Sequence, residues 1–226
     1  MDLERKLITS IIPHSLDQFY LDIAECKTKL VEHRIDGFSD PNNIQILYSD
    51  YNLNFLVTNR PKRNSSLSIK DEEARIAILK NAISNGAKFV DIELETPPEL
   101  LQDLINYAKL HGVTIIVSYH NYEKTLNRED LEVIVDTMQR TGADMLKCAC
   151  MANSYSDAHI MMDIQLKWSQ KIIAFGMGNY GSYSRIISLL YGAPFMYIPL
   201  NKKTAPGQLY FEEISTILNY LDQAEK

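Results

Sequence analysis

Short runs rich in β-branched and aromatic residues alternate with longer helix-like segments along the chain, and this alternation constrains the fold more than any other feature. The candidate strands number eight and span residues 7–12, 30–36, 54–59, 89–95, 114–120, 145–151, 171–177 and 195–200. The helical segments between them include residues 15–30, 69–86, 98–112, 128–142 and 182–192, and the last four end at a glycine, as many helices do. Strands that alternate with helices predict parallel strands with helical crossovers.

The number of strand–helix units selects among the parallel α/β folds. Eight units in 226 residues predict a compact (β/α)8 TIM barrel that forms one domain over residues 1–226. The second unit is the weakest, because residues 39–52 offer only a short helix that opens at Pro41. A doubly wound open sheet is the alternative fold, but its glycine-rich dinucleotide fingerprint is absent after the first candidate strand.

Charged side chains on two of the strands favour the barrel. They alternate along each strand and so share one face, with Glu32, Arg34 and Asp36 on the first strand and Asp91, Glu93 and Glu95 on the second. A strand inside an α/β fold has no face toward solvent. We therefore expect the charged faces to line a barrel lumen and the apolar faces to contact the helices.

Charge and composition exclude several classes of partner. The formal net charge of −6 argues against binding to nucleic acid or to an acidic membrane surface. The N-terminal stretch has no long apolar run, so we expect no secretory signal, no transmembrane helix and a cytoplasmic protein. The three cysteines do not suggest a disulfide framework, and the pair Cys148 and Cys150 lacks a second ligand cluster. We expect two core thiols and no metal site.

Lys147 is the one charged residue in the strand MLKCACM, and lysine is rarely buried. One interpretation is that its stem packs among apolar neighbours while the ammonium group reaches water. The other is chemical, because a desolvated lysine loses its proton more easily and becomes an amine nucleophile. The strand alone leaves both interpretations open.

Barrel enzymes hold their sites at the C-terminal ends of the strands, and this rule gathers five side chains at one mouth: Arg34, Arg60, Glu93, His120 and Lys147. Each has a structural alternative, such as an ion-pair layer, a satisfied core histidine or a solvated loop. A lysine, a histidine and a carboxylate on three neighbouring strands, beside arginines, nevertheless predict a reaction centre.

Seven segments carry a resemblance to a known family: VEHRID, VTNR, VDIELE, VSYH, GADMLKCACM, MGNYGSYSR and TAPGQ. In this order, and over nearly the whole chain, they resemble the type I 3-dehydroquinate dehydratases. The resemblance implies a (β/α)8 barrel, a homodimer, no cofactor and no metal. It also implies the reaction, which is syn loss of water from 3-dehydroquinate through a lysine imine, giving 3-dehydroshikimate in the shikimate pathway of aromatic amino acid biosynthesis.

The resemblance also implies a role for each matching residue. Lys147 matches the imine-forming lysine, His120 the general acid/base, and Glu93 the acid that orients it. Arg185 matches the arginine that binds the substrate carboxylate. The remaining matches are Glu32, Arg34 and Arg60, which would hold ring hydroxyls, Gln208 and Thr204, which would lie on a closing loop, and Ser10, which would add a hydroxyl.

Three positions depart from the family pattern. Thr204 stands where serine is common and keeps the hydroxyl, and Ala152 stands where proline is common. His33 replaces a larger apolar residue, and strand alternation predicts that it faces the helices. The polar segment 201–208, NKKTAPGQ, is predicted to be a lid over the barrel mouth.

Two other functions compete with the dehydratase. One is a different Schiff-base barrel lyase, an aldolase acting on a small keto acid, which would also use a lysine on the sixth strand. The arginine in GSYSR and the APGQ loop argue against it. The other is a non-catalytic binding protein on a retained barrel, which predicts loss of Lys147 or His120, and both are present.

Overall fold

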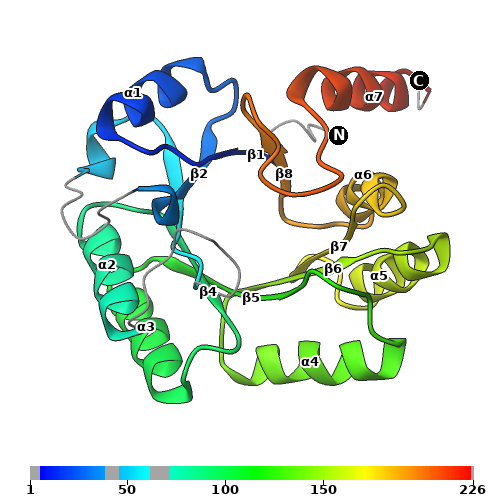
Figure 1. The fold of residues 1–226 in the computed structure, drawn as a ribbon, viewed down its shortest axis with the longest axis horizontal. Coiled ribbons are helices and arrows are strands. Elements are labelled where there is room, and N and C mark those ends of the chain that lie inside the picture. The colour runs from blue at the N-terminus through cyan, green and yellow to red at the C-terminus, as the bar shows by residue number, and fades with distance from the viewer. Residues whose placement is uncertain (1–5, 39–45, 62–71, 225–226) are drawn as a thin grey trace.

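Eight parallel strands form a nearly closed barrel in the computed structural model, which describes residues 6–38, 46–61 and 72–224 (Figure 1). The strands are β1 (Leu7–Ile11), β2 (Leu30–Arg34), β3 (Asn54–Thr58), β4 (Phe89–Glu93), β5 (Thr114–Asn121), β6 (Met145–Met151), β7 (Ile172–Met177) and β8 (Met196–Pro199). Their order is β7-β6-β5-β4-β3-β2-β1-β8. The predicted (β/α)8 architecture is confirmed.

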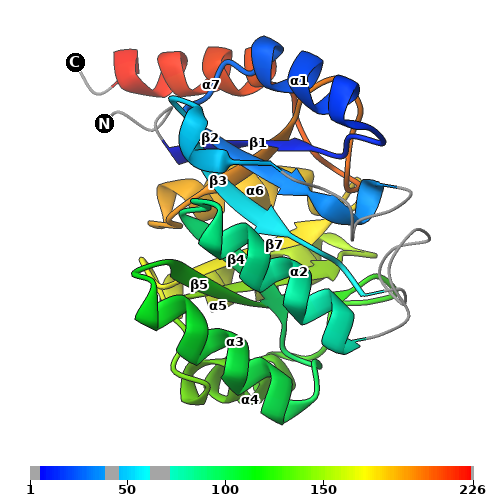
Figure 2. The same cartoon turned by 90° about the vertical axis from the view of Figure 1, so that its left-hand side faces the viewer.

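Helices follow most of the strands and cover the outside of the barrel. They are α1 (Leu16–Glu25), α2 (Glu72–Ser84), α3 (Pro98–Leu110), α4 (Arg128–Arg140), α5 (Tyr155–Lys167), α6 (Ser182–Leu190) and α7 (Phe211–Ala224). In Figure 2 the strand arrowheads point toward one side of the barrel, so the strands' C-terminal ends form a single mouth. Within the described residues, no helix has the length and apolar character needed to cross a membrane.

Local sequence signals set several helix ends. The side chain of Ser154 accepts from the backbone N–H of Asp157, whose carboxylate accepts from the N–H of Ser154, and this capping box starts α5. Gly86 has φ +96 after α2, a conformation that glycine adopts without steric cost. A Cβ there would also lie 2.9 Å from the backbone of Ser49.

Two expectations about element ends were wrong. The helix predicted over residues 15–30 ends at Glu25, because the side chain of Thr28 bonds to Thr9 and to the carbonyl of Leu30 and turns the chain into β2. Glu95 does not share the inward face of β4. The strand ends at Glu93, a turn follows, and Glu95 is exposed.

The chain around the second crossover contains two 3₁₀ turns, Ile35–Gly37 and Tyr48–Asp50. Asp36 therefore lies in a turn just beyond β2 rather than in the strand. The short helix predicted within residues 39–52 opens in residues 39–45, which lie outside the described residues, and residues 46–52 contain only the 3₁₀ turn.

The core has two parts, one on each side of the barrel wall. Outward residues such as Val31, Val90 and Val117 pack against the helices, together with Cys148 and Cys150, which are free buried thiols as predicted. Inward residues near the N-terminal ends of the strands form an apolar plug, which includes Ile8, Leu30, Leu56, Ile116 and Ile173. The plug fills the lumen toward the N-terminal ends of the strands, and the polar residues lie on its other side, toward the mouth.

Candidate active site

Lys147 projects from β6 into the lumen and is 5% exposed. Its Nζ lies 3.8 Å from Oδ2 of Asp91 and 3.9 Å from the ring centre of Tyr197. Burial disfavours the ammonium form and lowers the pKa of Lys147 to about 8, although the carboxylate of Glu32 opposes the shift. The lysine is therefore buried rather than snorkelling, and a substantial fraction of it is an amine in mildly alkaline solution.

His120 and Glu93 face each other from β5 and β4. Nδ1 of His120 lies 2.9 Å from Oε1 of Glu93, and the imidazole stacks on Tyr122 with 5.9 Å between ring centres. Burial lowers the pKa of His120, and Glu93 offsets part of this shift. Burial acts to raise the pKa of Glu93, but His120 and Arg60 hold it below its usual range. The pair is thus a carboxylate beside an imidazole that is neutral near pH 7.

Arg60 lies beneath this pair and joins three strands. Its Nη1 donates to Asp91 (2.6 Å), Glu93 (2.7 Å) and Ser118 (2.7 Å), and its Nη2 donates to Asp91 (2.9 Å). These bonds neutralise two carboxylates that would otherwise repel each other in the lumen. Both terminal nitrogens of Arg60 are already engaged, so it holds the floor of the site together.

Glu32 and Arg34 bring further polar groups from β2 to the mouth. The carboxylate of Glu32 accepts from Ser10 on β1 and, at 2.9 Å, from Thr58 on β3. Arg34 forms a two-pronged pair with Asp36, with distances of 2.8 and 2.7 Å. His33, the residue between them, points outward and contacts the hydroxyl of Tyr48, so the predicted direction of His33 is confirmed.

Arg185 is a buried cation without an acidic partner in the part of the chain that the structure describes. It projects from α6, is 2% exposed, and lies over the ring of Phe175 at 4.0 Å. Its Nη2 donates to the carbonyl of Pro206 (3.0 Å), while its buried Nε has no hydrogen-bond partner among the described residues. Burial alone lowers the pKa of Arg185 to about 9. An unpaired buried guanidinium costs folding free energy, and an anionic ligand would satisfy it.

The segment after β8 lies over the mouth. Oε1 of Gln208 accepts from the backbone N–H groups of Thr204 (2.7 Å) and Ala205 (3.0 Å), and the Thr204 hydroxyl donates to Ser10 (3.3 Å). Gly207 has φ +79, and a Cβ there would lie 2.5 Å from the carbonyl oxygen of Gly178. This close backbone contact explains a glycine at the turn.

The space left beneath this segment is small. The inner cavity has a volume of about 40 Å³ and is lined by Glu32, Arg34, Arg60, His120, Tyr122, Lys147, Ala149, Phe175, Met177, Arg185, Tyr197, Thr204, Ala205 and Gln208. Drug-sized ligands occupy pockets of roughly 300–1,000 Å³. A ligand of that size therefore does not fit beside Lys147 unless the segment over the mouth moves.

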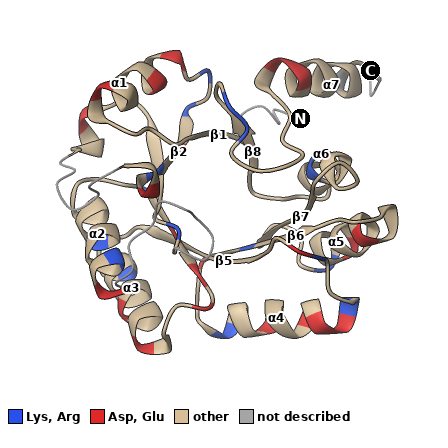
Figure 3. Cartoon of the chain, in the orientation of Figure 1, with Lys and Arg blue, Asp and Glu red and all other residues tan. Residues whose placement is uncertain are grey.

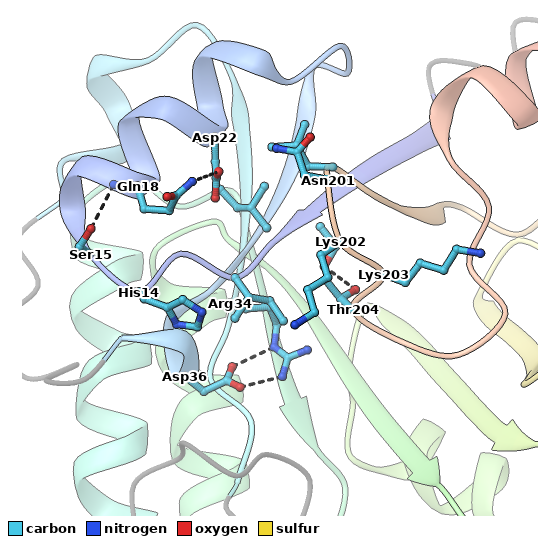
Figure 4. Close-up of a pocket in the computed structure, with 14 residues that line it drawn as sticks. His14, Ser15, Gln18, Asp22, Arg34, Asp36, Asn201, Lys202, Lys203 and Thr204 are labelled. Atoms are coloured by element: carbon cyan, nitrogen blue, oxygen red, sulfur yellow. Dashed lines mark hydrogen bonds and ion pairs between the residues drawn. The ribbon is translucent and has the colours of Figure 1, made fainter.

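A larger cleft of about 640 Å³ opens beside the inner cavity. Arg34 and Thr204 line both spaces, and the cleft lies between the start of α1 and the segment after β8. Basic residues mark this segment next to β1 in Figure 3. Figure 4 shows Lys202 reaching toward Arg34 and Lys203 pointing away. The cleft thus meets the inner cavity at Arg34 and Thr204.

All ten residues named from the sequence lie at this one mouth. Eight of them line the inner cavity, while Glu93 stands behind His120 and Ser10 lies beside Glu32. Tyr122, Tyr197 and Phe175 were not named. The alternation of β8 places residue 197 on the inward face and could have indicated Tyr197. Among the described residues, no group of histidine, cysteine and acidic side chains could hold a metal ion.

Sequence comparison points in one direction. A family model described as type I 3-dehydroquinase matches residues 9–225. A 3-dehydroquinate dehydratase from Methanococcus maripaludis is 35% identical over 196 residues, which cover 85% of this chain and 88% of the relative. One from Pyrococcus abyssi is 30% identical over 217 residues, covering 96% and 99%.

Solved structures agree with the sequence relatives. The type I 3-dehydroquinate dehydratase of Clostridium difficile, determined with covalently modified comenic acid, superposes with a TM-score of 0.89 at 23% identity and covers 98% of this chain and 94% of that one. The 3-dehydroquinate dehydratase of Aquifex aeolicus superposes with a TM-score of 0.77 at 28% identity and covers 93% and 96%. At 23% identity, the likeness to the Clostridium difficile enzyme shows the fold alone.

Proposed function

The chain belongs to the type I 3-dehydroquinase family and is a hydro-lyase, and from this premise we propose that it removes water from 3-dehydroquinate through an imine on Lys147. Family membership decides against the aldolase and the non-catalytic binding protein that the sequence left as alternatives. The chemistry proposed for each step rests on the side chains that line the site.

The imine step needs a neutral amine beside the ketone. Lys147 is buried, and its lowered pKa of about 8 makes the amine available at a pH where an exposed lysine stays charged. Once the imine forms, its cationic nitrogen withdraws electrons through the imine carbon, so the carbon next to the imine carbon gives up a proton more readily. Lys147 is the electron sink in this proposal.

Proton transfer is the work of His120. Its pKa is lowered by burial, so the imidazole is a free base near pH 7 and can take the proton from carbon. Glu93, 2.9 Å from Nδ1, orients the ring and stabilises the imidazolium that results. The imidazolium then donates its proton to the departing hydroxyl, which leaves as water from the same face.

The single observation that carries the proposal is the unpaired guanidinium of Arg185. The substrate has one permanent charge, a carboxylate, and Arg185 is a buried cation with an orphan donor that lines the same inner cavity as Lys147. A charge-assisted pair there would fix the ring's orientation and satisfy the arginine. Glu32, Arg34 and the hydroxyls of Ser10 and Thr204 then surround the remaining oxygens of the ring.

The test combines turnover with trapping. Purified protein mixed with 3-dehydroquinate should produce an ultraviolet-absorbing conjugated product, and borohydride should reduce the intermediate to a stable adduct. Peptide mass analysis should place the adduct on Lys147. Product without any adduct would refute the imine, and an adduct on Lys202 or Lys203 would refute the assignment.

The assembly of the enzyme rests on the family resemblance alone. We propose a homodimer that works in the cytoplasm. Light scattering coupled to size-exclusion chromatography tests the first point, since a chain of 25.9 kDa should elute with twice that mass. A monomer at micromolar concentration would contradict it.

A further inference from the structure

The ring of Tyr197 lies against Nζ of Lys147, and Tyr197 has no role in the proposed imine and proton-transfer steps. It projects from β8 into the lumen, is 3% exposed, and lines the inner cavity. The centre of its ring lies 3.9 Å from Nζ of Lys147. Its hydroxyl is buried and has no hydrogen-bond partner among the described residues. Tyr197 thus combines a ring that lies against the amine of Lys147 with a hydroxyl that has no acceptor among the described residues.

The hydroxyl is the more informative of the two. A buried polar group without a partner costs folding free energy, and phenylalanine would fill the same space without that cost. The carboxylate of Glu32 accepts from Ser10 and Thr58, that of Asp91 accepts from Arg60 and Ser118, and neither bonds to the Tyr197 hydroxyl. We therefore expect a ligand in the cavity lined by Tyr197 and Lys147 to supply the acceptor for the Tyr197 hydroxyl.

The ring has a second effect, on charge. The face of an aromatic ring attracts a cation, and the attraction is strongest where water is excluded. Arg60 and burial both disfavour a positive charge at Lys147. An imine nitrogen formed there carries such a charge, and the face of Tyr197 is positioned to stabilise it.

We propose that Tyr197 is a catalytic residue of the imine step, with its ring stabilising the cationic nitrogen and its hydroxyl donating a hydrogen bond to the ketone oxygen. The inference rests on the proposed function. The lone pair of Nζ adds to the ketone carbon, and the carbon–oxygen π pair moves to the oxygen beside the Tyr197 hydroxyl. The oxygen leaves as water after taking one proton from the nitrogen and one from solvent. The nitrogen keeps one hydrogen and the positive charge.

The experiment separates the ring from the hydroxyl. Tyr197→Phe removes only the hydroxyl, and Tyr197→Leu removes both. Phe195→Leu is the matched control, because Phe195 is an inward aromatic two residues earlier that packs edge-on against Phe89. For each folded variant, the rate of borohydride-trapped adduct formation from 3-dehydroquinate is followed in a single turnover, and folding is checked by thermal unfolding.

Tyr197→Phe should form the adduct at least about tenfold more slowly than wild type, since it lacks one donor to a developing oxyanion. Tyr197→Leu should lose about a further tenfold, whereas Phe195→Leu should keep the wild-type rate. A wild-type rate in Tyr197→Phe overturns the hydroxyl role, and equal rates in the Phe and Leu variants overturn the ring role. Absence of any adduct in the wild type would instead refute the proposed function.

Discussion

Nδ1 of His120 lies 2.9 Å from Oε1 of Glu93, and the same carboxylate oxygen accepts from Nη1 of Arg60 at 2.7 Å. Glu93 is therefore shared between the imidazole that we propose as the proton carrier and a guanidinium that keeps its charge. Arg60 keeps the carboxylate ionised, and the ionised carboxylate orients the imidazole of His120.

The two halves of the mechanism should fail differently. His120→Ala leaves the amine of Lys147 in place, so the substrate should still form a borohydride-reducible adduct, while turnover falls by about 10²–10⁴-fold. Glu93→Gln should lie between this variant and wild type. His111→Ala, an exposed histidine, serves as the control. Near-normal turnover in folded His120→Ala would make His120 a structural residue.

The pH dependence should report two groups in two steps. Adduct formation requires neutral Lys147, so its rate should rise with pH through about 8, the pKa of the buried lysine. The later proton transfer requires neutral His120, whose pKa lies below the usual value, so kcat should rise at a lower pH. Trapping rates and kcat measured from pH 5 to 10 test this order. If the trapping rate and kcat rise over the same pH range, the predicted order of the two titrations is wrong.

Arg185 should contribute to binding at the expense of stability. Arg185→Met removes the partner of the substrate carboxylate, and losing such a pair costs on the order of 2–5 kcal/mol, seen as a higher KM. The same change removes an uncompensated buried cation, so the ligand-free protein should unfold at a higher temperature. Arg140→Met, an exposed arginine, is the control. A lower melting temperature with unchanged KM would refute both halves.

The segment from Asn201 to Gln208 should open to admit substrate, because the cavity beneath it holds only about 40 Å³. Gln208→Ala removes the acceptor of the N–H groups of Thr204 and Ala205 and should weaken substrate binding more than it slows the imine chemistry. Limited proteolysis should cut the segment faster without ligand than with it. Equal cleavage rates in the two states would argue against closure.

Lys202 should attract the anionic substrate into the outer cleft. The chain has a net charge of −6, so local positive charge is needed to offset repulsion. Lys202→Glu should lower kcat/KM by about two- to fivefold at low salt, an effect that added salt screens. Lys203→Glu is the matched control, because Lys203 points away and lies over Tyr210. Equal effects of the two changes would exclude steering through the cleft.

Much of the site was predictable because the relevant signals are local. Side chains alternate along a strand with a period of two, and parallel strands place their C-terminal ends together. These rules were enough to bring Lys147, His120 and Arg34 to one mouth and to turn His33 outward. They failed at Glu95, where a turn begins two residues before the charged pattern ends.

The sequence by itself determined the barrel and the chemical types at its mouth, since strand–helix alternation and side-chain period need no long-range information. Only the tertiary structure decided which charges meet. Arg60 donates hydrogen bonds to Asp91 and Glu93, whereas Arg185 has no acidic partner among the described residues. The ring of Tyr197 lies against Lys147. Each relationship joins strands or helices distant in sequence, and each depends on how the strands tilt and stagger as the sheet curves. Distances of a few ångströms set the pKa values, and no spacing along the chain encodes them.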